Sequence, residues 1–278
     1  MHPVERLNQI LAGPDSGIDL AEAALLLARD EYPALDVAGY LARLDEMGER
    51  LKRRLRPDIS VGDKIAALNR YLYDEHGFHG NTEDYYDPRN SFLNEVLERK
   101  TGIPITLALV YIEVGRRVGL PLTGISFPAH FLVKCPVHGG TVVIDAFHKG
   151  ASLSLADLQQ RVAQAQDGVK PSRSAVAALL ADAGPREILV RMLRNLKSIY
   201  LHFNQLPQAL SVCERILLIE PDQPAELRER GGLYLKLECF RAALGDFQRC
   251  LDLEPDARDA DTLRERIVEL RQAAARLN

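Results

Sequence analysis

Residues 102–135 read GIPITLALVYIEVGRRVGLPLTGISFPAHFLVKC, and this stretch decides the fold. The apolar run that begins at Pro104 predicts a buried helix over about residues 104–118, because proline is favoured at the first helical position. Two strand candidates follow, and the second carries His130. A buried helix followed by a histidine on a strand is the layout of enzymes whose reactive cysteine opens the helix. The residues that open this helix are Pro104, Ile105 and Thr106, so the sequence offers no thiol there.

Three strand candidates lie downstream of the helix, at residues 122–127, 130–135 and 141–147. The last two flank a turn-rich segment and predict a hairpin. With Val137–Gly140 as its loop, Pro136 opposes Thr141 and Leu132 opposes Asp145. This register places His130 diagonally across from Asp145 on the same face of the sheet.

A carboxylate that orients an imidazole forms two parts of a nucleophile–base–orienter triad, so His130 and Asp145 are catalytic candidates. The inference depends on the register, because a shift of one residue would put the two side chains on opposite faces. Thr106 is the hydroxyl nearest the helix start, but a β-branched hydroxyl without a strong base is a poor nucleophile. Cys135 points away from His130 by the alternation of the strand, and we expect no thiol-dependent activity.

A polar, turn-rich segment, FHGNTEDYYDPRNS, spans residues 78–91 and predicts a functional or helix-capping loop. Its candidate binding residues are Asp87, Asn90 and Ser91. Side chains of these types either cap the helix that follows or contact a ligand directly, and the sequence leaves both readings open. A metal site would draw on His76, His79, Glu83, Asp84 and Asp87. No helical HExxH pattern accompanies them, and we predict no metal site and no cofactor.

The rest of the N-terminal region predicts helices over residues 1–57, a further helix ending near Gly77, and one from about Ser91. Polar helices and a linker rich in Gly, Pro and Ser occupy residues 150–184. We place a domain boundary near Gly184–Pro185, which gives domains of residues 1–184 and 185–278.

An internal repeat with a period of 34 residues occupies the C-terminal domain. Four positions recur in register, and the pairs are Leu193 and Leu227, Tyr200 and Tyr234, Ala209 and Ala243, Leu217 and Leu251. The motif Glu-Pro-Asp recurs at residues 220–222 and 254–256 and ends each unit, because proline cannot continue a helix. Gly231 and Phe247 stand where the first copy has Lys197 and Cys213. This pattern is typical of the tetratricopeptide repeat, with a final capping helix over about residues 258–276.

Composition excludes several classes of protein. With a net charge of −4 the chain lacks the basic excess of a general nucleic-acid binder. The four cysteines, at 135, 213, 239 and 250, show no metal-binding spacing and no disulfide framework. The N-terminus does not resemble a secretory signal, and no apolar run reaches the ~20 residues of a membrane helix. We therefore expect a cytoplasmic protein that contacts neither nucleic acid nor membrane.

The segment YYDPRNSFLNEVLERKTGIPITLALVYIEVGRRVGLPLTGISFPAHFLV, within a match over roughly residues 20–270, resembles the SirB-type family of bacterial transglutaminase-like proteins. That family also carries C-terminal tetratricopeptide repeats. The wider superfamily uses Cys, His and Asp in that order, and His130 and Asp145 match the last two. The cysteine position falls at Ile105 or Thr106, so the resemblance does not carry the superfamily's acyl-transfer or proteolytic chemistry to this chain.

The sequence thus predicts an α+β fold: a mostly helical transglutaminase/papain-like domain with a small antiparallel sheet, then an all-α tetratricopeptide-repeat domain. The favoured function is that of a non-catalytic, regulatory protein that binds a protein or peptide through the repeat groove. The alternative is a hydrolase or acyltransferase that uses His130 and Asp145 with a nucleophile other than cysteine. The sequence does not identify the partner or the oligomeric state.

Overall fold

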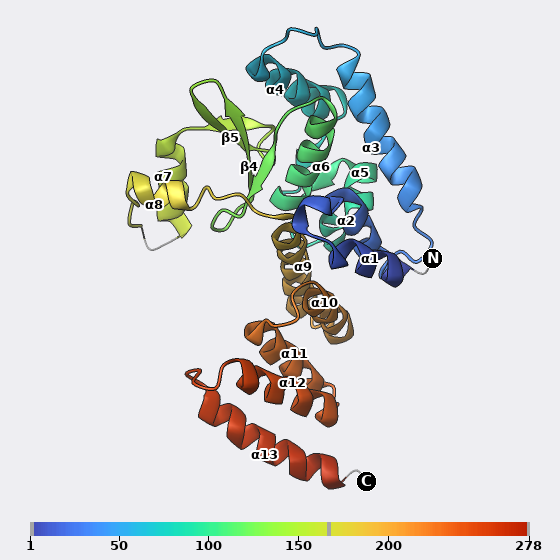
Figure 1. Ribbon diagram of the computed structural model, residues 1–278, viewed down its shortest axis with the longest axis vertical. Helices are drawn as coiled ribbons and strands as arrows, with labels where there is room; N and C mark the ends of the chain where they lie inside the picture. Colours follow the sequence, from blue (N-terminus) through green and yellow to red (C-terminus); the bar gives the residue numbers. More distant parts are fainter. Residues whose placement is uncertain (1–2, 166–167, 277–278) are drawn as a thin grey trace. The chain divides into compact units, whose positions relative to one another are not determined.

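The computed structural model describes residues 3–165 and 168–276. The chain divides into two compact units, Met1–Met192 and Leu193–Asn278, each taken by itself below (Figure 1). The division lies within helix α9 (Pro185–His202), whose first residue follows the boundary expected from sequence at Gly184. That residues 1–184 and 185–278 fold as separate domains stays a prediction. Among the described residues, no helix has both the length and the apolar character needed to cross a membrane.

The first unit is mostly helical. Its α-helices are α1 (Pro3–Ala12), α2 (Leu20–Ala28), α3 (Val37–Lys52), α4 (Val61–Asn69), α5 (Leu93–Arg99), α6 (Pro104–Arg117), α7 (Leu155–Ala165) and α8 (Arg173–Ala178). A π-helical segment, Arg70–Glu75, continues α4, and a 3₁₀ turn, Pro88–Ser91, precedes α5.

Helix α6 is the centre of this unit. Every residue from Pro104 to Gly115 is buried, as the unbroken apolar sequence predicts. The helix contacts α3, α4 and α5 as well as strand β4 (Leu132–Val137), so it lies between the other helices and the sheet (Figure 1). Glu113, only 2% exposed, is neutralised by Arg117, whose Nη1 lies 2.6 Å from its carboxylate. A charge within an apolar helix is tolerated here because it is paired.

The main sheet is antiparallel and has the strand order β3-β4-β5-β6. Its other strands are β3 (Thr123–Ile125), β5 (Gly140–Asp145) and β6 (Ala151–Leu153). Pro136 pairs with Thr141 and Val133 with Ile144, which is the register expected from sequence. One face of the sheet packs on α6. Side chains of α7 and α8 join Leu132 and Val143 in an apolar cluster on the other face.

Two strand predictions need correction. The strand expected at 130–135 begins at Leu132 instead, and His130 lies in a turn before it. The turn contains Ala129 at φ 53°, a left-handed conformation that an extended strand cannot include. Strand β6 was not expected, because its sequence, ASL, is too short to show an alternating pattern. A separate two-stranded parallel pair joins β1 (His79–Gly80) to β2 (Thr101–Gly102), immediately before α6.

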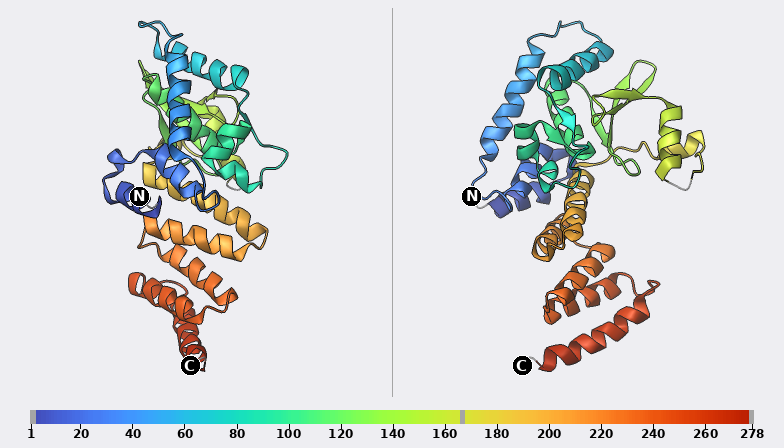
Figure 2. Two further views of the ribbon diagram at one scale, coloured as in Figure 1. Left: turned by 90° about the vertical axis from the view of Figure 1, so that its right-hand side faces the viewer. Right: turned by 180° about the vertical axis from the view of Figure 1, so that it is seen from behind.

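The described residues of the second unit form helices joined by turns, as the repeat predicts, and Figure 2 shows these helices from two further sides. Its helices after α9 are α10 (Leu206–Ile219), α11 (Pro224–Lys236), α12 (Phe240–Leu253) and α13 (Ala260–Arg276). Helices α10 and α12 end just before Pro221 and Pro255, as expected from a residue that removes a backbone donor. The apolar cluster of α11, α12 and α13 includes Leu227, Phe247 and Leu263.

The packing between the two helices of a repeat differs in the two copies at one pair of facing positions. In the second, a Cβ on Gly231 would lie 2.6 Å from the Phe247 ring, so only glycine leaves room for that ring. In the first, Lys197 and Cys213 occupy the equivalent positions, and the larger side chain faces the smaller one. The Lys197 ammonium is buried and ion-paired with Glu226 and with Glu229.

Candidate functional site

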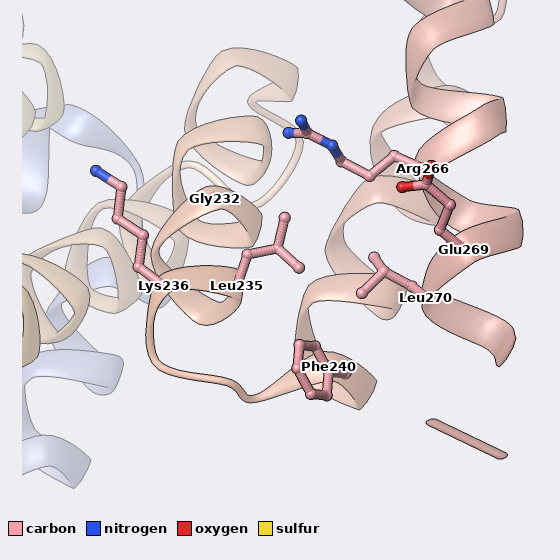
Figure 3. A pocket seen from close by; sticks show the side chains of 7 residues that line it. All are labelled: Gly232, Leu235, Lys236, Phe240, Arg266, Glu269 and Leu270. Atoms are coloured by element: carbon pink, nitrogen blue, oxygen red, sulfur yellow. The ribbon is translucent and has the colours of Figure 1, made fainter. Parts of the chain in front are cut away.

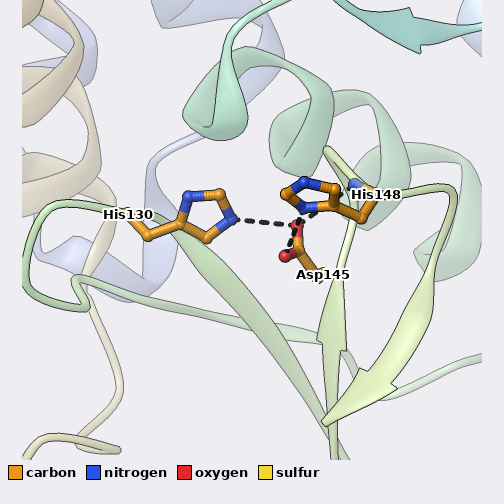
Figure 4. A group of neighbouring side chains, drawn as sticks. All are labelled: His130, Asp145 and His148. Carbon is orange, nitrogen blue, oxygen red and sulfur yellow. Dashed lines mark hydrogen bonds and ion pairs between the residues drawn. The ribbon is translucent and has the colours of Figure 1, made fainter. Parts of the chain in front are cut away.

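His130 and Asp145 form a hydrogen-bonded pair (Figure 4). His130 Nε2 lies 2.9 Å from Asp145 Oδ1, with the histidine side chain 13% exposed and the carboxylate fully buried. The contact arises because Val133 pairs with Ile144, so the start of β4 lies beside the end of β5, and the turn before β4 brings His130 to Asp145. The two residues proposed from spacing are therefore adjacent in the structure.

Asp145 accepts hydrogen bonds from more donors than this one imidazole. Its Oδ1 also accepts from the backbone N–H groups of Phe147 at 3.1 Å and His148 at 3.2 Å. Its Oδ2 contacts His148 Nδ1 at 2.8 Å and Arg161 Nη2 at 2.7 Å. Burial alone would raise the pKa of the Asp145 carboxyl, but its contacts with His130, His148 and Arg161 lower that pKa well below its ordinary value. The carboxylate is ionised at neutral pH and holds three side chains.

His148 and Arg161 were not identified from the sequence. His148 stands three residues after Asp145, in the turn that the aspartate side chain itself organises through its bonds to two backbone N–H groups. An Asp followed by a tight turn is the one local signal that could have pointed to His148. Arg161 comes from α7, and only the packing of that helix on the sheet brings it to Asp145.

Side chains that are distant in the sequence hold both turns in place. Arg191 Nη2 donates to the carbonyl oxygen of His130 at 3.2 Å, and Arg191 Nη1 donates to the Ser126 hydroxyl at 2.9 Å. The Tyr73 hydroxyl donates to the carbonyl oxygen of Ala146 at 2.9 Å. These contacts fix the backbone on either side of the pair, so the imidazole and the carboxylate are held by the fold and not only by each other.

Phe147 links this pair to the strands that lead into α6. Its ring packs edge-to-face on His130, with centroids 6.1 Å apart. The same ring covers the Cα of Gly80 in β1, where a Cβ would approach it to 2.5 Å. Because β1 pairs with β2, the strand immediately before α6, His130 lies on the side of the domain where α6 begins.

Thr106 does not supply a free hydroxyl there. Its Oγ1 donates to the carbonyl oxygen of Asn90 at 2.8 Å and accepts from the N–H of Ile103 at 3.1 Å. The residue is fully buried, as is Ile105 at 1% exposure. Thr106 therefore caps its own helix, and its hydroxyl proton is engaged by a backbone carbonyl.

The remaining thiol candidate is inert in this geometry. Cys135 is fully buried on β4, in the strand after the His130 turn, and burial raises the pKa of its thiol. Its Sγ lies 3.7 Å from the carbonyl oxygen of the following proline. A protonated, solvent-excluded thiol is not a nucleophile.

The three loop residues Asp87, Asn90 and Ser91 have internal contacts to different degrees. Asp87 caps the 3₁₀ turn through the N–H of Arg89 and is ion-paired with Arg89 and Arg99, at 2.9 and 3.1 Å. Asn90, fully buried, donates to the carbonyl oxygen of Asp84 at 2.8 Å and accepts from the Asn81 amide. The Ser91 hydroxyl is buried without a hydrogen-bond partner among the described residues. Capping and loop fixing account for the first two, and the direct ligand role stays a prediction.

Two of the loop residues that were weighed as a metal site, His79 and Asp87, have other partners. His79 Nδ1 lies 2.9 Å from the carbonyl oxygen of Gly77, and Asp87 is held by arginines. Within the described part of the chain, the group with metal-ligand spacing is His130, Asp145 and His148. The carboxylate–imidazole arrangement is suited to moving a proton at His130 Nδ1, the ring nitrogen not bonded to Asp145.

Comparison with known proteins places this geometry in a family context. Residues 38–194 match the model of the transglutaminase-like superfamily, and residues 196–268 match a tetratricopeptide-repeat model. A UPF0162 protein of Xylella fastidiosa (strain Temecula1) is 43% identical over 95% of this chain and 94% of its own length. A UPF0162 protein of Pseudomonas aeruginosa is 32% identical over 92% of this chain and 93% of its own length.

A shorter similarity reaches a eukaryotic protein. Human F-box only protein 21 is 36% identical over 143 residues, which are 49% of this chain and 21% of that protein. No solved structure matches the chain.

Proposed function

We propose, from the premise that this chain belongs to the transglutaminase-like superfamily, that it binds a protein partner and carries out no acyl transfer. The observation that carries the proposal is the burial of the helix start where the superfamily has its cysteine. Ile105 fills that position with hydrocarbon, and the Thr106 hydroxyl proton is bonded to the Asn90 carbonyl. An acyl-enzyme needs a nucleophile beside the base, and this arrangement supplies none. We also propose that the chain is of the SirB type and acts in the cytoplasm.

The partner site we propose is the pocket between α11, α12 and α13 (Figure 3). It has a volume of about 460 Å³. Its apolar lining residues are Leu235, Phe240 and Leu270, and its charged ones are Lys236, Arg266 and Glu269. In Figure 3 the Arg266 side chain extends from α13 toward α11. This chemistry fits a protein segment that presents an apolar side chain next to a carboxylate.

Affinity capture with charge-reversed variants tests this role. Arg266→Glu is expected to lose the partner that the intact chain captures, because it reverses a charge on the pocket wall. Arg271→Glu is the matched control, since Arg271 is exposed on the same helix but does not line the pocket. Equal capture by the chain and both variants would contradict the pocket assignment. His130→Gln should leave capture unchanged.

A second candidate function rests on the intact His130–Asp145 pair at 2.9 Å. It is a hydrolase or acyltransferase in which the imidazole activates a nucleophile other than cysteine. Hydrolysis that depends on His130 would favour it over the binding role.

A further inference from the structure

The three side chains His130, Asp145 and His148 come from two turns and one strand end and converge on one another (Figure 4). Their ligand-type atoms all lie within 4.8 Å of one another. Two of the separations are hydrogen-bond distances, 2.9 Å from His130 Nε2 to Asp145 Oδ1 and 2.8 Å from His148 Nδ1 to Asp145 Oδ2. A transition ion with bonds of about 2.0–2.2 Å keeps neighbouring ligands about 3–3.5 Å apart. A small adjustment of the side chains would therefore admit an ion.

We propose that His130, Asp145 and His148 bind a divalent transition-metal ion, with Zn²⁺ as the probe, through two imidazole nitrogens and one carboxylate oxygen. This inference is independent of the partner-binding role. Two imidazoles with one carboxylate suit Zn²⁺, Fe²⁺ or Ni²⁺, whereas Mg²⁺ and Ca²⁺ prefer ligand sets made of oxygen. The chemistry of the donors thus selects the class of ion.

The surroundings of Asp145 provide the outer contacts that a ligating carboxylate needs. Backbone N–H groups of Phe147 and His148 fix one oxygen, and Arg161 fixes the other at 2.7 Å. Metal ligands are oriented by hydrogen bonds of this kind. The Arg161 charge also opposes a cation close by, so we expect weaker binding than in a closed, cysteine-rich zinc site.

Besides the small adjustment of the side chains, binding requires that the coordinating imidazole nitrogen give up its proton. Because the Asp145 carboxylate is ionised and can only accept, the imidazole nitrogen that faces it donates the hydrogen bond. When that nitrogen coordinates an ion, a neutral imidazole carries its proton on the other ring nitrogen, and an imidazolium releases one proton to solvent. Access is open on one side, because the His148 side chain is 57% exposed.

The test uses the full, tag-free chain after dialysis against a chelator. Co²⁺ is added while its visible absorption is followed, and Zn²⁺ is then titrated by calorimetry in competition. We expect one ion per chain and at least tenfold weaker binding for His148→Ala and for His130→Gln. His138→Ala, an exposed histidine in the hairpin turn, is the matched control and should bind as the unaltered chain does.

Circular dichroism of each variant separates loss of ligands from loss of folding. His148→Ala removes a side chain that is 57% exposed, and Asp145 keeps its contacts with His130, Arg161 and two backbone N–H groups, so the fold should persist. Two results would overturn the proposal. One is unchanged binding in both His130 and His148 variants, which would mean an adventitious ion only. The other is an unaltered chain that binds neither Co²⁺ nor Zn²⁺ at one equivalent.

Discussion

The Thr106 hydroxyl lies 2.8 Å from the carbonyl oxygen of Asn90 and donates its proton to it. This contact joins the start of α6 to the loop before α5, two segments that the sequence singled out separately. It satisfies a buried carbonyl and leaves the hydroxyl without a proton to give to a catalytic base. The side chain of Thr106 is thereby part of the structural core at the start of α6.

We predict different losses of stability for two substitutions of Thr106. Thr106→Val keeps the shape but leaves the Asn90 carbonyl and the Ile103 N–H unpaired, so it should lower the free energy of unfolding by about 1–3 kcal/mol. Thr106→Ser keeps both hydrogen bonds and should cost less. Urea denaturation measures both. Equal stability of the two variants would contradict the capping role.

Asp145→Asn should destabilise the fold by about 3 kcal/mol near neutral pH, because a neutral amide replaces the buried charged acceptor of His130, His148 and Arg161. The pKa of Asp145 is lowered in the folded state. Its contribution is therefore fully present above the unfolded value of about 3.9 and is lost as pH falls toward the folded value. The stability difference between the two proteins should shrink from pH 5 to pH 3 in urea denaturation. A difference that is constant or grows on acidification would refute this.

The hairpin register could be predicted from its turn, and it brings the start of β4 beside the end of β5. His130 reaches Asp145 from the turn before β4 and not from the strand face that the sequence predicted. Pro136 opposite Thr141 follows from the loop length, and the register fixes which face each later residue takes. The buried α6 and the repeat helices were predictable for a similar reason. A long apolar run or a repeated motif shows a periodicity in the sequence that by itself predicts a helix.

The other members of the site could not be predicted. Arg161 reaches Asp145 from a helix that packs on the far side of the sheet from α6, and no local pattern encodes that contact. The turn at His130 depends on Ala129 in a left-handed conformation, which its residue type does not favour. The same turn is held by Arg191 through bonds to backbone and hydroxyl oxygens. Tertiary contacts of this kind override local preference.

Gly80→Ala should distort the site from a distance. The new Cβ would lie 2.5 Å from the Phe147 ring, which packs on His130. We expect a loss of about 1–3 kcal/mol in stability and a shift of the His130 imidazole resonances in NMR spectra. Gly140→Ala is the control, since a Cβ there meets no atom within 4 Å. Unchanged His130 chemical shifts in Gly80→Ala would show that Phe147 does not transmit the change at Gly80 to His130.

Substitution of two neighbouring glycines of α11 by alanine should change the stability of the repeat unit in opposite directions. Gly231→Ala forces a Cβ to within 2.6 Å of the Phe247 ring and should destabilise the repeat unit by about 1–3 kcal/mol. Gly232→Ala meets nothing within 4 Å and should stabilise it by up to about 1 kcal/mol through helix propensity. Thermal unfolding of the full chain reports both. The same sign for both substitutions would contradict the packing described for this repeat.

The absence of acyl-transfer chemistry is tested most directly by burst-phase kinetics with 4-nitrophenyl acetate in the presence of a chelator. A covalent intermediate would release up to one equivalent of nitrophenolate per chain before the steady state. We predict no burst, and equal slow rates for the unaltered chain, His130→Gln and the control His138→Gln. A burst that His130→Gln abolishes and His138→Gln preserves would contradict the account, because it would require a nucleophile beside His130.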